Sequence, residues 1–155
     1  MVLDIIVRQA CGLDISSLVK YNQLLAKETE NISLDKEILR LGVENALNNK
    51  GCQYIVAELN DNVVGQTLIT SEWSDWRNGL IWWLQSVYVH PDYRKRGVFN
   101  SIYNYIETLA KADPTVKGLR LYVMKDNLIG LNTYQSIGMI NSGYLVYEKF
   151  DLSHI

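Results

Sequence analysis

The first third of the chain has two patterns of apolar side chains, a short β-branched run and a longer stretch with helical spacing. Residues 5–8 form a short β-branched run, which predicts a strand. Two stretches follow in which apolar positions have the three- and four-residue spacing of an amphipathic helix. The first begins after Asp14, a residue suited to a helix N-cap, and the second ends before Gly51. The positions expected to face inward are Ile15, Leu18, Val19 and Leu25 in the first helix, and Leu34, Ile38, Leu41 and Ala46 in the second.

Strand patterns dominate the middle of the chain. Residues 53–59 and 63–70 are apolar runs joined by a short polar connection at 60–62, which is typical of a β-hairpin. Residues 80–89 are apolar on both faces and predict a central strand covered on both sides. Helical spacing then returns from Val98 to the break at Asp113-Pro114. A strand over 119–124, a short helix over 127–137 and a strand over 144–150 complete the pattern.

The predicted order of elements is β-α-α-β-β-β-α-β-α-β, within a single domain that spans residues 1–155. Hairpins place consecutive strands antiparallel, whereas a strand–helix–strand crossover places its two strands parallel. The expected fold is therefore α/β. It has a central mixed, mostly antiparallel sheet of about six to seven strands, with helices on both faces.

Composition narrows the classes of function. Of the 155 residues 48% are apolar and 21% are charged, which is the profile of a globular domain. The net charge of −2 argues against a broad nucleic-acid-binding surface. Cys11 and Cys52 match no metal-ligand spacing, so no metal is expected. The apolar run at the N-terminus is too short for a signal peptide or a membrane span, and we expect a cytoplasmic protein with no membrane attachment.

The most informative stretch is VHPDYRKRGVF, residues 89–99. It leaves a predicted central strand and opens a helix, whose first turn presents unpaired N–H groups and the positive end of the helix dipole. Gly97 lets the backbone approach an anion closely, and Arg94, Lys95 and Arg96 add positive charge. Three cations on a turn are often merely solvated, but this placement favours a phosphate site. Neither the P-loop pattern nor G-x-G-x-x-G is present.

The same stretch carries a family resemblance. LQSVYVHPDYRKRGVF, residues 84–99, resembles the central motif of the GNAT superfamily of N-acetyltransferases, [Q/R]-x-x-G-x-[G/A] after a strand phrase. Arg94 and Gly97 are in register with that motif. Phe99 departs from its small third residue, and a ring there should either pack under the helix or narrow the cofactor groove.

A second motif lies further along the chain. DNLIGLNTYQSIGM, residues 126–139, resembles the family's D-N-x-x-A-x-x-[L]-Y-x-x-x-G-F, with Asn127, Tyr134 and Gly138 in register. The predicted element order also agrees with the family over essentially the whole chain. Two spaced motifs and a matching topology together identify the chain as similar to GNAT acetyltransferases.

The resemblance implies that acetyl-CoA is the co-substrate and that its acetyl group passes directly to an amine. It implies that the backbone of the fourth strand pairs with the pantetheine arm and that the following loop holds the pyrophosphate. The residues implied are Val87, Tyr88, Val89, Arg94, Lys95, Arg96, Gly97, Val98, Phe99, Asn100 and Asn127. Gln85 and Ser86 are the two polar residues of an otherwise apolar strand, and a β-bulge could lie there. The alternative is that they are two polar residues whose hydrogen bonds are formed within the protein.

Tyr134 matches the family's general acid. An amine must lose a proton before it attacks the thioester, and the departing thiolate then gains from a proton. A phenol with an ordinary pKa of about 10 is protonated at neutral pH and can supply it. The alternative is that Tyr134 is one of ten tyrosines that fill the core.

The base and the acceptor pocket are less defined by the sequence. Glu72 is the predicted base, with Asp75, Glu28 and Glu30 as alternatives that could act through water. As a set, these carboxylates could attract a cationic amine. Trp73, Trp83 and Gln85, with Glu28 and Glu30, are the predicted substrate-binding residues, and the tryptophans could hold an ammonium by cation–π contact.

Three functions compete at this stage. The leading one is an N-acetyltransferase for a small-molecule or peptide amine, and fold-level analogy suggests a homodimer. The second is a non-catalytic acetyl-CoA or CoA sensor, because the family's frequent glutamate on the fourth strand is missing here. The third, nucleic-acid binding through Arg94–Arg96, is disfavoured by the net charge, and no nucleic-acid partner is expected.

Overall fold

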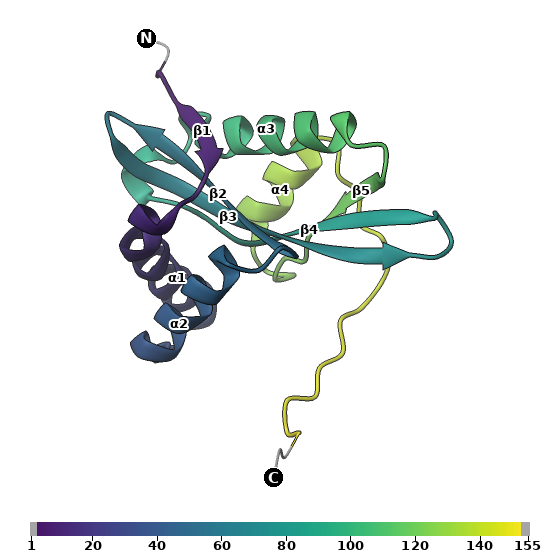
Figure 1. The fold of residues 1–155 in the computed structure, drawn as a ribbon, viewed down its shortest axis with the longest axis horizontal. Helices are drawn as coiled ribbons and strands as arrows, with labels where there is room; N and C mark the ends of the chain where they lie inside the picture. Colours follow the sequence, from purple (N-terminus) through teal and green to yellow (C-terminus); the bar gives the residue numbers. More distant parts are fainter. Residues whose placement is uncertain (1–2, 153–155) are drawn as a thin grey trace. The chain divides into compact units, whose positions relative to one another are not determined.

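A computed structural model describes residues 3–152 (Figure 1). By their contacts the residues fall into two compact units, Met1–Tyr122 and Val123–Ile155, which are taken in turn below. No helix in residues 3–152 combines the length and the apolar character that crossing a membrane requires. Nor does this range bring together three or more His, Cys, Asp or Glu side chains in a way that could hold a metal ion.

The first unit contains a mixed five-stranded sheet. Its strands lie in the order β1-β2-β3-β4-β5, with antiparallel pairing from β1 to β4 and parallel pairing between β4 and β5. This confirms the α/β class and the mostly antiparallel sheet, but with five strands in the described chain rather than six or seven. The elements are β1 (Ile6–Gln9), η1 (Gly12–Asp14), α1 (Ile15–Glu30), α2 (Lys36–Leu47), β2 (Cys52–Leu59), β3 (Asn62–Ser74), β4 (Gly79–Val89), η2 (Pro91–Tyr93), α3 (Val98–Ala112) and β5 (Val116–Arg120).

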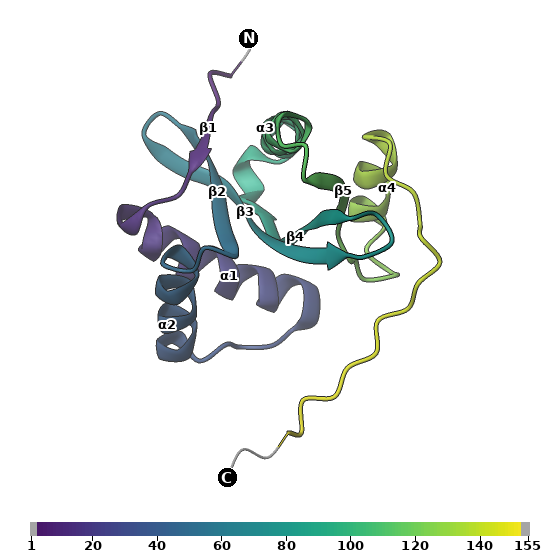
Figure 2. The ribbon, with the colours of Figure 1, turned by 45° about the vertical axis from the view of Figure 1, so that its right-hand side comes forward.

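Helices cover both faces of this sheet, as predicted (Figure 2). On one face α1 and α2 contribute Leu18, Val19 and Val43 to a core with Tyr54 and Val56 of β2. On the other face, α3 packs closely over β3. A Cβ at Gly65 would lie 2.9 Å from Val98 Cγ1 and 3.2 Å from Ile102 Cδ1, so only glycine at this position lets the helix approach so closely.

The second helix differs from its prediction in register. It starts at Lys36, because Asp35 Oδ1 accepts the Ile38 N–H at 2.9 Å as an N-cap, and it ends at Leu47 rather than at Gly51. Ile38 and Leu41, expected to face the core, are exposed, and Ile38 is 72% accessible. The buried face carries Leu39, Val43, Ala46 and Leu47 instead. Apolar residues occupy two overlapping faces of this helix, so spacing alone does not identify the buried one.

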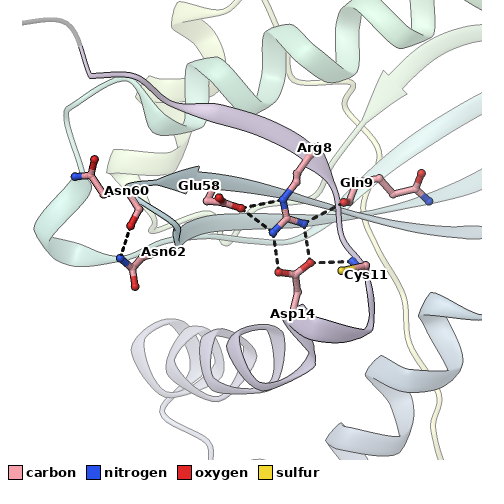
Figure 3. Close-up of polar contacts among 7 residues, drawn as sticks. All are labelled: Arg8, Gln9, Cys11, Asp14, Glu58, Asn60 and Asn62. Carbon is pink, nitrogen blue, oxygen red and sulfur yellow. Dashed lines mark hydrogen bonds and ion pairs between the residues drawn. The ribbon is translucent and has the colours of Figure 1, made fainter.

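An ion-pair cluster joins β1 to the start of α1 (Figure 3). Arg8 donates to both oxygens of Asp14, at 2.8 and 2.9 Å, and to Glu58 of β2 at 2.9 Å. Asp14 Oδ2 also accepts the Cys11 N–H at 2.8 Å. Asp14 therefore occupies the N-cap position of α1 without capping it by its side chain, since its carboxylate faces Arg8 and η1. The Arg8 guanidinium, helped by the Cys11 N–H, holds the pKa of this buried carboxyl below its usual value.

Over its described residues, 123–152, the second unit contains one helix, α4 (Leu128–Ser136), and a long extended tail. The Asn127 side chain accepts the Gly130 N–H at 3.0 Å and so caps this helix. A Cβ at Gly130 would lie 2.8 Å from Asn127 Nδ2, which accounts for a glycine where the motif has alanine. The strand predicted over 144–150 is absent, because these residues are extended and exposed with no ladder partner. The strand predicted over 119–124 is shifted, because β5 ends at Arg120.

Candidate active site

A β-bulge interrupts β4 at Ser86, whose φ is 51°. In the ladder with β3, Gln66 pairs with Tyr88 and Leu68 pairs with Gln85, so Ser86 and Val87 together lie opposite Thr67. The bulge predicted at Gln85-Ser86 is thereby confirmed. Both residues are also bonded internally, as the alternative interpretation held. Thr67 Oγ1 donates to the Gln85 carbonyl at 2.8 Å, and Gln66 Nε2 donates to the Ser86 carbonyl at 3.1 Å.

Beyond the middle of β4, the strand loses its parallel neighbour. The β4–β5 ladder ends at the pair Trp83–Arg120, while β4 continues to Val89 with β3 on its other side. In the described sheet, therefore, one edge of residues 84–89 has no strand partner. Peptide groups along such an edge can pair with an extended ligand as a further strand would. This stretch, with its one unpaired edge, contains the residues predicted to bind the pantetheine arm: Val87, Tyr88 and Val89.

Residues 90–97, here called the 90–97 loop, connect the end of β4 to α3. Its backbone is left-handed at Lys95, with φ 61°, and at Gly97, with φ 84°. Gly97 is the N-cap of α3 and offers no side chain to accept the first-turn N–H groups. A Cβ at Gly97 would meet no atom within 4 Å, so the position where a side chain of this residue would begin is open. An uncapped helix N-terminus beside a glycine suits a phosphate group chemically.

The three cations of this loop have different surroundings. Arg94 donates to Glu28 at 2.7 Å and to the Val89 carbonyl at 2.8 Å, and its guanidinium lies 5.3 Å from the centre of the Tyr88 ring. The Arg96 guanidinium lies 5.9 Å from the centre of the Tyr93 ring. Lys95 is exposed, and in the described chain it makes no ion pair. Its charge is therefore the one least committed to other protein groups.

Tyr88 joins the end of β4 to the end of α1. Its ring is buried, at 3% exposure, and its hydroxyl donates to Glu28 Oε1 at 3.1 Å. Burial, followed by the Glu28 carboxylate, raises the pKa of Tyr88 to about 12. Glu28, predicted to attract the acceptor, is thus bonded to both Tyr88 and Arg94. Glu30, its predicted companion, is exposed at the end of α1.

Several predicted acceptor-side residues share one face of the sheet. Side chains alternate along each strand, and directly paired residues share a face. Thr70 pairs with Trp83, and Gln85 Nε2 donates to Thr70 Oγ1 at 2.5 Å. Glu72, two residues beyond Thr70, therefore lies on the same face, where Arg120 Nη1 holds its carboxylate at 2.5 Å. The ring of Trp83 also lies 5.9 Å from that of Tyr122, tilted by 55°.

Trp73 does not belong to this group. It is an odd number of residues from Thr70 and therefore lies on the opposite face. It pairs with Leu80 and is 62% exposed. The two tryptophans predicted to bind the substrate therefore lie on opposite faces of the sheet, and only Trp83 shares a face with Gln85 and Glu72.

Gln66, which lies beside the bulge, is a candidate site residue that the sequence pattern did not single out. Its side chain is fully buried on β3, on the face that carries Tyr88, and its Oε1 has no hydrogen-bond partner among the described residues. Buried amide oxygens are rarely left unsatisfied, and those that are often bind water or a ligand. The available signal was a glutamine in the middle of the apolar run VVGQTLIT.

Phe99 packs along α3 rather than following the small-residue pattern of the motif. Its ring lies 6.3 Å from that of Tyr103, one helical turn further on, and is half-buried. The two expectations for this ring, that it packs under the helix or that it narrows the cofactor groove, stay predictions. The neighbouring Asn100 is exposed, whereas the side chain of Val98 is buried between α3 and β3.

Tyr134 belongs to the second unit, on the last turn of α4. Its ring is half-buried, and burial raises the pKa of its phenol above the ordinary value. A phenol of this kind stays protonated across the neutral range and can act as a proton donor. Its role as a general acid remains a prediction from the motif.

Comparison with known proteins shows to which family the chain belongs. The family model described as acetyltransferase (GNAT) family matches residues 18–139, most of the chain. The chain belongs to this family, whose chemistry is acetyl transfer. A solved structure described as a possible acetyltransferase from Clostridium difficile 630 shares 42% sequence identity, with a TM-score of 0.88. That alignment covers 97% of this chain and 99% of the other.

Two more distant structures share the fold. A predicted acetyltransferase with acetyl-CoA from Clostridium acetobutylicum is 22% identical, with a TM-score of 0.75 over 97% of this chain and 99% of the other. An aminoglycoside acetyltransferase from an uncultured soil metagenomic sample, in complex with sisomicin, is 14% identical, with a TM-score of 0.75 over 96% of this chain and 97% of the other.

Proposed function

We propose that the protein is an N-acetyltransferase that moves the acetyl group of acetyl-CoA directly to a primary amine of a small molecule or peptide. One observation carries the proposal. The bulged half of β4, which has an unpaired edge where β5 has ended, leads through the 90–97 loop to an uncapped helix N-terminus at Gly97. An extended arm that ends in a pyrophosphate matches this sequence of features, first an open strand edge and then an anion site.

The protein groups have the following roles in the proposal. The backbone at Val87–Val89 pairs with the pantetheine arm, and the first-turn amides of α3 bind the pyrophosphate, with Lys95 and Arg96 adding charge and Asn127 contributing from its cap. The neutral amine attacks the thioester carbon, and a backbone N–H of β4 stabilises the resulting oxyanion. As the C–S bond breaks, Tyr134 protonates the departing CoA thiolate. Before the attack, Glu72 takes one proton from the ammonium form of the acceptor, and as the amide forms the attacking nitrogen loses a second proton to water.

The proposed acceptor lies over the sheet face that carries Gln85, Glu72 and Trp83. An aromatic ring and a carboxylate suit an ammonium group before it loses its proton. The aminoglycoside acetyltransferase from the soil metagenomic sample, which shares this fold, was solved in complex with sisomicin. We take a homodimer as the working assembly.

A second function, a non-catalytic CoA-binding sensor, is favoured by one observation. Glu72 and Glu28, two carboxylates considered as bases, are both engaged by arginines, at 2.5 Å and 2.7 Å. One experiment separates the two functions. Acetyl-CoA is incubated with the protein and a panel of amines, and released thiol is measured while CoA binding is followed by calorimetry. Thiol release with at least one amine supports the enzyme, CoA binding without release supports the sensor, and no CoA binding overturns both.

A further inference from the structure

Two side chains of β3 hold the two carbonyl groups of the β4 bulge. Gln66 Nε2 donates to the Ser86 carbonyl at 3.1 Å, and Thr67 Oγ1 donates to the Gln85 carbonyl at 2.8 Å. Adjacent residues of a strand project from opposite faces of the sheet, so the two donors reach the bulge from opposite sides. Both donor residues are fully buried, which favours these hydrogen bonds over bonds to solvent.

The orientation of these carbonyl groups determines the direction of the N–H groups that follow them. The described chain has no cis peptide bond, and in a planar trans peptide the C=O and N–H groups point in opposite directions. Because the carbonyls of Gln85 and Ser86 are held toward β3, the N–H groups of Ser86 and Val87 point away from β3, toward the open edge of β4. In a regular strand successive N–H groups alternate between the two sides. Here the left-handed backbone at Ser86, with φ 51°, lets two successive N–H groups share one side.

The amide of Gln66 is only half used. Its Oε1 has no hydrogen-bond partner among the described residues, and burial of an unsatisfied polar atom destabilises the folded state. An apolar side chain, such as those of Val64 and Leu68 on the same face of β3, would avoid this cost. What the glutamine adds over an apolar residue is therefore its Nε2 donor to the Ser86 carbonyl.

We propose that Gln66 and Thr67 are positioning residues for acetyl transfer, which hold the bulge carbonyls and thereby aim the N–H groups of Ser86 and Val87 together at the thioester oxygen. This inference rests on the proposed function, to which it adds a second N–H donor and the side chains that orient both. When the amine adds to the thioester carbon, an electron pair of the C=O bond moves to the oxygen. Two successive N–H groups on one side are suited to stabilise that negative charge.

The carbonyl stretching frequency of bound acetyl-CoA, labelled with carbon-13 at the acetyl carbonyl, reports these hydrogen bonds in the absence of an amine. Hydrogen bonds to the oxygen lower this frequency. Gln66→Met and Thr67→Val keep the approximate size of each side chain and remove its donor, so both should shift the infrared band to higher wavenumber. With a reactive amine, both should lower kcat by about 10- to 100-fold and change KM for acetyl-CoA by less than about threefold. Thr67→Ser keeps the hydroxyl, is the matched control, and should retain both the band and kcat.

A second control separates the proposal from a general loss of stability. Ile69→Val shortens a buried side chain on the same face of β3 as Thr67 without removing a donor, so neither the band nor kcat should change. Circular dichroism establishes that each variant is folded, and either donor variant is sufficient for the test.

The outcomes also separate this inference from the proposed function. Failure of the unmodified full chain to bind acetyl-CoA overturns the proposed function, and this inference with it. Acetyl-CoA that binds with the same band in the unmodified protein and in the folded donor variants refutes the inference alone. A shift that Thr67→Ser or Ile69→Val reproduces equally also refutes it, because the donors would then not be its cause.

Discussion

Glu28 at the end of α1 holds the Arg94 guanidinium, which follows η2, across 2.7 Å. The same guanidinium donates to the Val89 carbonyl and lies over the Tyr88 ring. The arginine of the sequence motif is therefore tied to the end of β4 and to the first helix. This favours a positioning role for Arg94, which fixes where the 90–97 loop begins, and leaves anion binding to the backbone, Lys95 and Arg96.

Glu28→Gln tests this interpretation of Arg94. Both side chains are about two-fifths exposed, at 43% and 38%, so the pair should be worth no more than about 1 kcal/mol. We expect the dissociation constant for CoA to rise by no more than about fivefold, with little change in Tm. Glu30→Gln, at the same helix end, is the control. Tighter CoA binding by Glu28→Gln would show instead that Arg94 contacts the phosphates and that Glu28 competes for it.

Gly97→Ala isolates the backbone conformation of the helix start. No atom lies within 4 Å of the added Cβ, so the cost comes from φ at 84°, on the order of 1–2 kcal/mol. We expect CoA affinity measured by calorimetry to fall about tenfold as the loop relaxes away from this conformation. Gly42→Ala, also unobstructed but inside α2, should instead raise the free energy of unfolding by about 0.5–1 kcal/mol. Unchanged CoA affinity in Gly97→Ala would rule out the helix start as the anion site.

Local patterns predicted the elements that bury one clear face. The loop after β4, the bulge at Gln85-Ser86 and the helix from Val98 all follow from short-range rules about strands, glycine and helix starts. The prediction of the buried face of α2 was wrong at Ile38. Apolar residues lie on two sides of that helix, and only packing against β2 selects one of them.

Side-chain partners and unpaired strands could not be predicted in the same way. The pairing of Arg94 with Glu28 joins residues 66 positions apart in sequence, and that of Arg120 with Glu72 joins residues 48 apart. Local spacing contains no information about such distant pairs. Residues 144–150 have the composition of a strand, but a strand also needs a neighbour, and a single sequence does not identify it.

Asp14 predicts a specific pH dependence of stability. Its pKa in the folded state is lowered, chiefly by Arg8, so its contribution is complete above the unfolded value of about 4 and is lost as the pH falls through the folded value. Asp14→Asn should lower the free energy of unfolding by about 2 kcal/mol at pH 7, and this difference should shrink toward pH 3. Urea unfolding across this range measures it, with the exposed Asp61→Asn as control. A difference independent of pH would contradict the ion-pair interpretation.

Tyr134→Phe tests the proton donor. The variant keeps the ring and removes the hydroxyl, so kcat with a reactive amine should fall by about 100-fold or more, while KM for acetyl-CoA changes little. Because burial raises the pKa of Tyr134, loss of its proton should not reduce kcat of the unmodified enzyme below about pH 10. Tyr105→Phe on α3 controls for the loss of a phenol elsewhere. A variant with unmodified kcat would exclude Tyr134 as the general acid.

Three variants distinguish a catalytic role of Glu72 from a structural role of its ion pair with Arg120. If Glu72 accepts the amine proton, Glu72→Gln should lower kcat by about 10- to 100-fold, whereas Asp75→Asn leaves kcat unchanged. Arg120→Met removes the partner at 2.5 Å but keeps the carboxylate, so it should retain most of the activity. Since both side chains are partly exposed, each variant should cost no more than about 1 kcal/mol of stability. Equal losses of kcat in Glu72→Gln and Arg120→Met would show that the ion pair shapes the sheet, and would leave water as the proton acceptor.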